Sequence, residues 1–133
     1  MGPSEHRKTV LLVDDDSDFL FQQRLQLEAA GFQVLSAADS TEAVRLLEQQ
    51  RPDIAVLDVM MERPDAGFTL CHHIRRRDPS IPVILVTSVS SETGMEFDLA
   101  SEPARSWIQA DALLAKPVRF EQLRRELDRL LGA

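Results

Sequence analysis

The sequence has few of the features that mark secreted, membrane or nucleic-acid-binding chains. Its 133 residues include a single cysteine, Cys71, so no disulfide can form within the chain, and a reducing compartment such as the cytoplasm is expected. No apolar run approaches the roughly 20 residues of a membrane span, and the first residues lack the apolar core of a signal peptide. The formal net charge of -7 disfavours direct binding to nucleic acid or to an anionic membrane.

What the chain does have is enough apolar material for one compact core. Hydrophobic residues make up 44% of the sequence, and a chain of this length can fold as one domain without disulfides or a structural metal. We expect a single domain over residues 8–133, preceded by a flexible N-terminus over residues 1–7.

Five short apolar runs alternate with helical patterns along the chain. The runs show little polar alternation, which is typical of parallel strands covered on both faces; they are Thr9–Asp14, Phe32–Ala37, Ile54–Asp58, Pro82–Ser88 and Ala112–Lys116. The pattern predicts an α/β fold with a doubly wound, five-stranded parallel sheet and helices on both faces. Gly94 and Pro103 interrupt any continuous helix within Ser90–Asp111, so an irregular segment is expected before the last strand.

The helical patterns carry recognisable ends and faces. In the first, Phe21, Leu25 and Ala29 recur four apart, Leu20 and Leu27 are expected to broaden this buried stripe, and Gly31 is expected to end the helix. Asp39 begins the second as the first residue of a capping box. The third covers roughly residues 67–77. The last carries apolar residues at helical spacing before Gly132, namely Phe120, Leu123, Leu127, Leu130 and Leu131.

Polar residues follow the predicted strands where each strand ends. They are Asp14, Asp15 and Asp16 after the first run, Asp58 after the third, Thr87 and Ser88 after the fourth, and Lys116 after the fifth. Carboxylates about 4 Å apart repel by about 4 kcal/mol at an effective dielectric of 20, which a divalent cation would offset. Magnesium prefers such oxygen ligands and suits a site shared with a phosphoryl group, for which Lys116 and Thr87 supply a cation and a hydroxyl. Asp58 is then a plausible nucleophile, and Asp16 is expected to cap the first helix.

The segments TVLLVDDD, AVLDVMM, VILVTS and LLAKPVRFEQL resemble the receiver domain of two-component response regulators, over nearly the whole chain. The resemblance implies a flavodoxin-like fold with strand order 2-1-3-4-5. It implies that Asp58 is the phosphoacceptor, and that Mg²⁺ is held by Asp14, Asp15, Asp58 and the backbone carbonyl of Met60.

The same resemblance assigns roles to the later motifs. Thr87, Ser88 and Lys116 match the phosphoryl-binding and switch positions, and the Lys116–Pro117 peptide is expected to be cis. Leu113 stands where many members carry a switch aromatic.

The implied function is that of a signalling phosphoacceptor rather than a conventional enzyme. A histidine kinase or phosphotransfer protein would supply the phosphoryl group, and the receiver would catalyse its own phosphorylation and slow dephosphorylation. Signalling would pass through contacts with an output protein. The resemblance is also compatible with a homodimer. The chain would be either a stand-alone protein or part of a longer one.

Two segments depart from the family pattern. Glu62 stands where the family usually has proline, and Gly67 follows Asp58 by nine positions (67 − 58 = 9). Thr87 and Lys116 are 29 positions apart (116 − 87 = 29), a longer interval than usual, and we hypothesise that Trp107 or Phe97 within it contacts a partner.

Two other functions fit parts of the pattern. A haloacid-dehalogenase-type phosphatase would use Asp14 as nucleophile and Asp16 as acid/base, but it leaves Asp58 unexplained. A receiver-like module that binds partners without phosphorylation is the second alternative.

Overall fold

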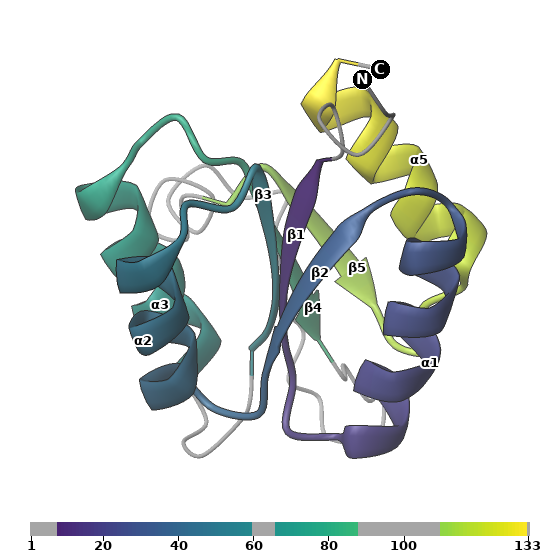
Figure 1. The fold of residues 1–133 in the computed structure, drawn as a ribbon, viewed down its shortest axis with the longest axis horizontal. Helices are drawn as coiled ribbons and strands as arrows, with labels where there is room; N and C mark the ends of the chain where they lie inside the picture. Colours follow the sequence, from purple (N-terminus) through teal and green to yellow (C-terminus); the bar gives the residue numbers. More distant parts are fainter. Residues whose placement is uncertain (1–7, 60–65, 88–109, 133) are drawn as a thin grey trace, which may run out of the picture.

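The computed structural model describes residues 8–59, 66–87 and 110–132 of the chain, and these residues build one parallel sheet (Figure 1). Its five strands are β1 (Thr9–Val13), β2 (Gln33–Ala37), β3 (Ile54–Asp58), β4 (Val83–Thr87) and β5 (Ala112–Ala115), in the order β2-β1-β3-β4-β5. Strand number, direction and order are those expected from the sequence. The strand bounds also agree with the predicted apolar runs to within one residue at each end.

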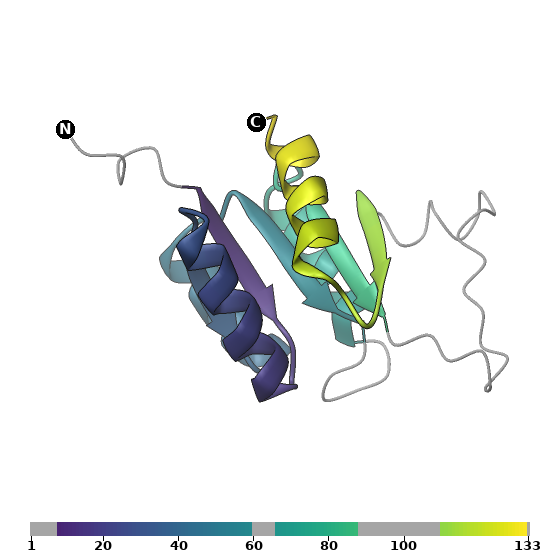
Figure 2. The ribbon, with the colours of Figure 1, turned by 90° about the vertical axis from the view of Figure 1, so that its right-hand side faces the viewer.

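Helices cover both faces of this sheet. They are α1 (Ser17–Ala29), α2 (Ser40–Gln49), α3 (Ala66–Arg77) and α5 (Phe120–Leu131). Figure 1 shows α2 and α3 on one face and α1 and α5 on the other, and Figure 2 shows the molecule from the side of α1 and α5. The predicted flexible N-terminus and nearly all of the predicted irregular segment lie outside the described residues. Among the helices of the described part, none is long and apolar enough to cross a membrane.

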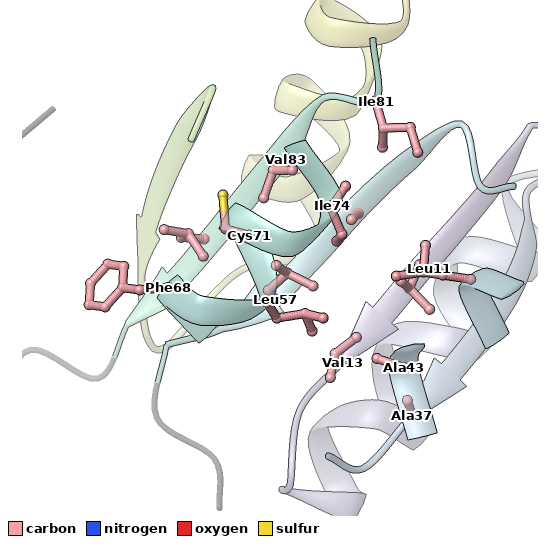
Figure 3. Packing of buried hydrophobic residues seen from close by; sticks show 14 of the residues in the cluster. Leu11, Val13, Ala37, Ala43, Leu57, Phe68, Cys71, Ile74, Ile81 and Val83 are labelled. Atoms are coloured by element: carbon pink, nitrogen blue, oxygen red, sulfur yellow. The ribbon is translucent and has the colours of Figure 1, made fainter. Parts of the chain in front are cut away.

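Successive residues of the central strands pack alternately into two separate hydrophobic cores, one on each face of the sheet. In β1, Leu11 and Val13 pack toward α2 and α3, whereas Val10 and Leu12 pack toward α1 and α5. Figure 3 shows the first of these cores, in which Leu57 of the sheet lies near residues of α3, and Leu11 and Val13 lie toward Ala43 of α2. Because side chains alternate along a strand, a strand buried on both faces must be apolar at every position. This is why the strands appeared in the sequence as unbroken apolar runs.

Cys71 lies within this first core, on the inner face of α3 (Figure 3). Burial raises the pKa of its thiol to about 11, although the nearby Arg75 charge opposes the shift. The thiol is therefore protonated at neutral pH and acts as a small apolar side chain.

The inner face of α1 differs from the predicted one. Leu27 is buried and Leu20 packs against the second core, as expected, but Phe21 and Leu25 are 63% and 52% exposed, and Ala29 is exposed as well. The side that faces the core carries Leu20, Gln23 and Leu27, which are three and four residues apart, with Phe19 next to Leu20. The prediction was wrong for Phe21, Leu25 and Ala29 because packing against the second core buries Gln23 instead.

The ends of α1 and α2 follow the sequence signals. Asp39 Oδ1 accepts a hydrogen bond from the Glu42 N–H at 2.8 Å, and the Glu42 side chain accepts one from the Ala38 N–H at 2.9 Å. The capping box therefore reaches one residue further back than the usual reciprocal pair. At the end of α1, Gly31 adopts φ +99°, a left-handed conformation in which glycine is favoured.

Candidate functional site

Four strands deliver polar side chains to one edge of the sheet, the lower edge in Figure 1. Asp14 directly follows β1, Asp58 ends β3, Thr87 ends β4, and Lys116 directly follows β5. Because all the strands are parallel, their carboxyl ends meet at the same edge. The structure therefore brings together residues that are separated by up to about a hundred positions in the chain.

Three carboxylates form a compact acidic cluster at this edge. One carboxylate oxygen each from Asp14, Asp15 and Asp58 lies within 4.8 Å of the others. Asp14 is 1% exposed and Asp58 is 4% exposed, whereas Asp15 is exposed to solvent. Two buried acids and one accessible acid, all offering oxygen, fit a hard divalent cation that keeps part of its water shell. The Met60 carbonyl, also expected at this site, lies outside the described residues.

Lys116 is the cation that contacts both buried acids. Its Nζ lies 2.9 Å from Asp14 Oδ2 and 3.7 Å from Asp58 Oδ2. Burial lowers the pKa of Lys116, but contact with Asp14 and the charges of Asp58 and Asp16 outweigh it, so the pKa is raised. The ammonium therefore stays charged at neutral pH, and three carboxylates with one ammonium leave a net charge of about -2 when all are ionised. The Lys116–Pro117 peptide is cis, as expected.

Backbone hydrogen bonds hold these strand ends together. The Lys116 N–H donates to the Thr87 carbonyl at 2.8 Å, and the Val59 N–H donates to the Val86 carbonyl at 2.8 Å. Thr87 is buried, at 3% exposure. The lysine, the threonine and the Asp58 strand end are thus fixed relative to one another by the sheet itself.

Asp16, the third aspartate of the run, caps α1. Its Oδ1 accepts hydrogen bonds from the N–H groups of Asp18 at 3.0 Å and Phe19 at 3.2 Å. Its own N–H donates to Asp14 Oδ1 at 2.9 Å. The capping role expected for Asp16 is confirmed, and the cap connects the start of α1 to a residue of the acidic cluster.

Sequence reasoning missed the contacts of two residues beside the cluster. The first is Gly67 of α3, noted in the sequence only for its spacing from Asp58, whose N–H donates to the Val59 carbonyl at 2.8 Å. A Cβ at position 67 would lie 2.2 Å from the Asp58 carbonyl oxygen and 2.5 Å from the Val59 Cα. The helix therefore touches the backbone of Asp58 through a position where any side chain would collide.

The second missed residue is Phe19, whose ring centroid lies 4.9 Å from Lys116 Nζ. The signal available in the sequence was its place in the first turn of a helix that begins at the site edge. No periodicity could pair it with a lysine 97 positions away (116 − 19 = 97).

The remaining predicted positions divide into two groups. Leu113 of β5 is partly buried and packs against the core that includes Leu57 and Leu85, on the α3 side of the sheet. Ser88, Trp107 and Phe97 lie outside the described residues.

Comparison with known proteins gives a consistent result. The model of a family described as the response regulator receiver domain matches residues 10–128. The chain is 36% identical over 111 residues to the transcriptional regulatory protein AfsQ1 of Streptomyces coelicolor, a match that covers 84% of this chain and 45% of that protein. It is 34% identical over 122 residues to the response regulator MprA of a Mycobacterium species, covering 92% of this chain and 50% of that protein.

Solved structures match nearly end to end. A CheY-like receiver domain protein from Methanospirillum hungatei has a TM-score of 0.80 at 25% identity, covering 95% of this chain and 94% of that one. A response regulator structure from Chloroflexus aurantiacus has a TM-score of 0.78 at 28% identity, covering 96% and 99%. The chain spans half or less of the length of the curated relatives above, although it spans nearly all of these structures.

Replacing Gly67 by alanine should displace the end of β3. The added methyl meets backbone atoms of Asp58 and Val59, so rotating a side chain cannot relieve the collision. We expect a loss of about 1 to 3 kcal/mol in the free energy of unfolding, as for other overpacked sites. Amide NMR shifts should change at Asp58 and Val59.

Gly132→Ala is the matched control for this substitution. Gly132 also disfavours alanine, because its φ is +73°, but a Cβ there meets open space. It should lower stability while the amide shifts of Asp58 and Val59 stay in place. Unchanged shifts and stability in Gly67→Ala would contradict the close contact described here.

Proposed function

The chain belongs to the family of response regulator receiver domains, and on this premise we propose that Asp58 accepts a phosphoryl group in a two-component or phosphorelay system. The observation that carries the proposal is the position of Asp58. Its buried carboxylate ends β3, lies within 4.8 Å of two further acids, and is 3.7 Å from the ammonium of Lys116. A carboxylate in such a site can act as nucleophile while nearby cations offset the charge of the incoming group.

Mg²⁺ is the ion that we propose for the acidic cluster. Asp14 and Asp15 would hold it together with Asp58 and the Met60 carbonyl, and the exposed Asp15 gives it access from solvent. When bound, it would draw charge from the phosphoryl oxygens. The net charge of about -2 left by three carboxylates and Lys116 matches the charge of one divalent cation.

The chemistry proposed for the protein groups is a simple displacement. An Asp58 oxygen forms a bond to phosphorus while the bond between phosphorus and the donor breaks, and the donor leaves with that electron pair. With a phosphohistidine donor the leaving group is an imidazole, supplied by a histidine kinase or a phosphotransfer protein. Slow attack of water on the phosphorus of the acyl phosphate would then break its bond to the Asp58 oxygen, which releases inorganic phosphate and restores the carboxylate. The protein would thus catalyse its own modification without acting as a conventional enzyme.

Lys116 and Thr87 are the groups proposed to respond to the new charge. Lys116 Nζ lies 3.7 Å from Asp58 Oδ2, so the ammonium is already placed to contact a phosphoryl oxygen carried by Asp58. Thr87 ends the strand next to β3 and would offer its hydroxyl to the same group, with Ser88 beside it. Because Leu113 has no ring to swing inward, the output signal would leave through other contacts.

The output is proposed to pass to another protein or protein region. AfsQ1 is named a transcriptional regulatory protein, and this chain matches less than half of it. We therefore propose signalling through protein contacts, in the cytoplasm, without direct contact of this domain with DNA or membrane. Homodimer formation and a partner contact through Trp107 or Phe97 stay predictions.

The phosphatase alternative is disfavoured by the role of Asp16. That mechanism needs Asp16 as a general acid beside an Asp14 nucleophile, but Asp16 Oδ1 is engaged by two N–H groups of α1. A module that binds partners without phosphorylation remains the alternative that the next experiment separates.

Incubation with acetyl phosphate and Mg²⁺ should add one phosphoryl group to the wild-type protein, measured by intact mass. The adduct should be absent without Mg²⁺ and absent in Asp58→Asn, which keeps the size of the side chain but removes the nucleophile. Asp18→Asn is the control, because Asp18 is an exposed acid at the same edge and lies outside the cluster. An adduct that survives Asp58→Asn and is lost in Asp14→Asn would support the phosphatase alternative, and no adduct at all would support the binding module.

Mg²⁺ should also stabilise the folded protein without any phosphodonor. At a concentration 100 times its dissociation constant, a ligand that binds only the folded state adds about 2.7 kcal/mol. We expect the melting temperature to rise on Mg²⁺ addition in wild type and in Asp18→Asn, and to stay nearly constant in Asp15→Asn. An equal rise in Asp15→Asn would remove that residue from the proposed metal site.

A further inference from the structure

The side chain of Lys116 is held by an aromatic ring as well as by carboxylates. Its Nζ lies 4.9 Å from the centroid of the Phe19 ring, within the roughly 6 Å range of cation–π attraction. The nearest carboxylate oxygen, on Asp14, is 2.9 Å away. The ammonium therefore has an aromatic face as one neighbour and acidic groups as the others.

The position of this ring is fixed by the start of α1. The Phe19 N–H donates to Asp16 Oδ1 at 3.2 Å, and the Asp16 N–H donates to Asp14 Oδ1 at 2.9 Å. The half-buried Phe19 side chain also packs against the core between the sheet, α1 and α5. The same acidic residue that contacts Lys116 thus anchors the helix turn that places the ring.

A lysine side chain needs such support to act at a fixed point. Its flexible four-carbon stem has high rotamer entropy, and the ammonium is strongly hydrated in water. The contacts with Asp14 and Asp58 both act on the ammonium through carboxylate oxygens. The Phe19 ring adds a third contact of a different kind, a cation–π attraction that favours the charged form at this position.

We propose that Phe19 is a positioning residue for phosphoryl transfer: its ring holds the Lys116 ammonium between Asp14 and Asp58, where the phosphoryl oxygens would arrive. This inference rests on the proposed function of Asp58. Phe19 touches the lysine and needs no contact with the phosphoryl group. Its role is to keep the ammonium in place before the reaction.

The rate constant of phosphorylation by acetyl phosphate tests this role, since a small donor needs no protein docking on α1. Two substitutions weaken the cation–π attraction between the ring and the Lys116 ammonium. Phe19→Leu keeps an apolar side chain but removes the ring, and a ring-fluorinated phenylalanine at position 19 keeps the shape of the ring. Each should slow phosphorylation by a factor of about 2 to 30, from the energies typical of cation–π contacts. Phe19→Trp restores an electron-rich ring and should return the rate to near the wild-type value.

The chain contains a matched contact far from the site. Arg124 Cζ lies 5.5 Å from the centroid of the Phe32 ring, on the outer side of the same core. Phe32→Leu and a ring-fluorinated phenylalanine at position 32 should lower stability or leave it unchanged without altering the rate constant. If the rate constant falls equally in the Phe32 and Phe19 variants, the slower phosphorylation is explained by loss of packing alone, and the proposal is overturned.

A measurement on the unphosphorylated protein separates this inference from the proposed function. The sequence contains two lysines, Lys8 and Lys116, so the NMR signals of their ε-methylene groups are readily assigned, with the exposed Lys8 as reference. The Phe19 ring current should shift the Lys116 signal relative to Lys8, and Phe19→Leu should remove the shift. Without a shift in wild type, the contact and the proposal fail.

The outcomes of the two measurements are distinct. If Phe19→Leu forms the adduct at the wild-type rate, the positioning role is wrong while Asp58 remains the acceptor. If wild type forms no adduct, the proposed function fails and the role of Phe19 falls with it. A ring-current shift together with slower phosphorylation in Phe19→Leu and recovery in Phe19→Trp supports the inference.

Discussion

The repulsion among Asp14, Asp15 and Asp58 is the constraint on which the rest of this structure depends. Two of these acids are buried, and a buried charge without a partner costs several kcal/mol. Lys116 offsets part of that cost through its contacts with Asp14 and Asp58. The remaining negative charge makes the edge a site for a cation. It also explains why an apolar strand can end in consecutive aspartates, since the strand delivers them to a place where positive charge is available.

The fold supplies rigidity where these charges meet. Each central strand is buried on both faces and hydrogen-bonded to its neighbours, so its end is placed by the whole sheet. Two helices also contact the residues at these strand ends. α3 reaches the Asp58 backbone through Gly67, and α1 begins at the Asp16 cap and places Phe19 against Lys116. Sheet and helices therefore act together on the residues that would perform the chemistry.

The sequence predicted those parts that depend on local pattern. Apolar runs with little polar alternation located all five strands, and the Asp16 cap could be expected because aspartate after a strand commonly begins a helix. The predicted inner face of α1 was wrong in part, since Leu27 is buried as expected but Gln23 is buried while the more apolar Phe21 is exposed. Which side of α1 is buried depends on packing against strands far away in the sequence, and the hydrophobic periodicity of the helix does not reveal that packing. The contacts of Gly67 and Phe19 were missed for the same reason, because each depends on distances between residues far apart in the chain.

The central claim is that this site accepts a phosphoryl group on one particular acid. Borohydride reduces an aspartyl phosphate to homoserine, so reduction of the phosphorylated protein followed by peptide mass spectrometry identifies the modified position directly. Homoserine is expected at position 58, and only when Mg²⁺ was present during phosphorylation. Homoserine at position 14 or 15, or none in a protein that had gained phosphoryl mass, would contradict it.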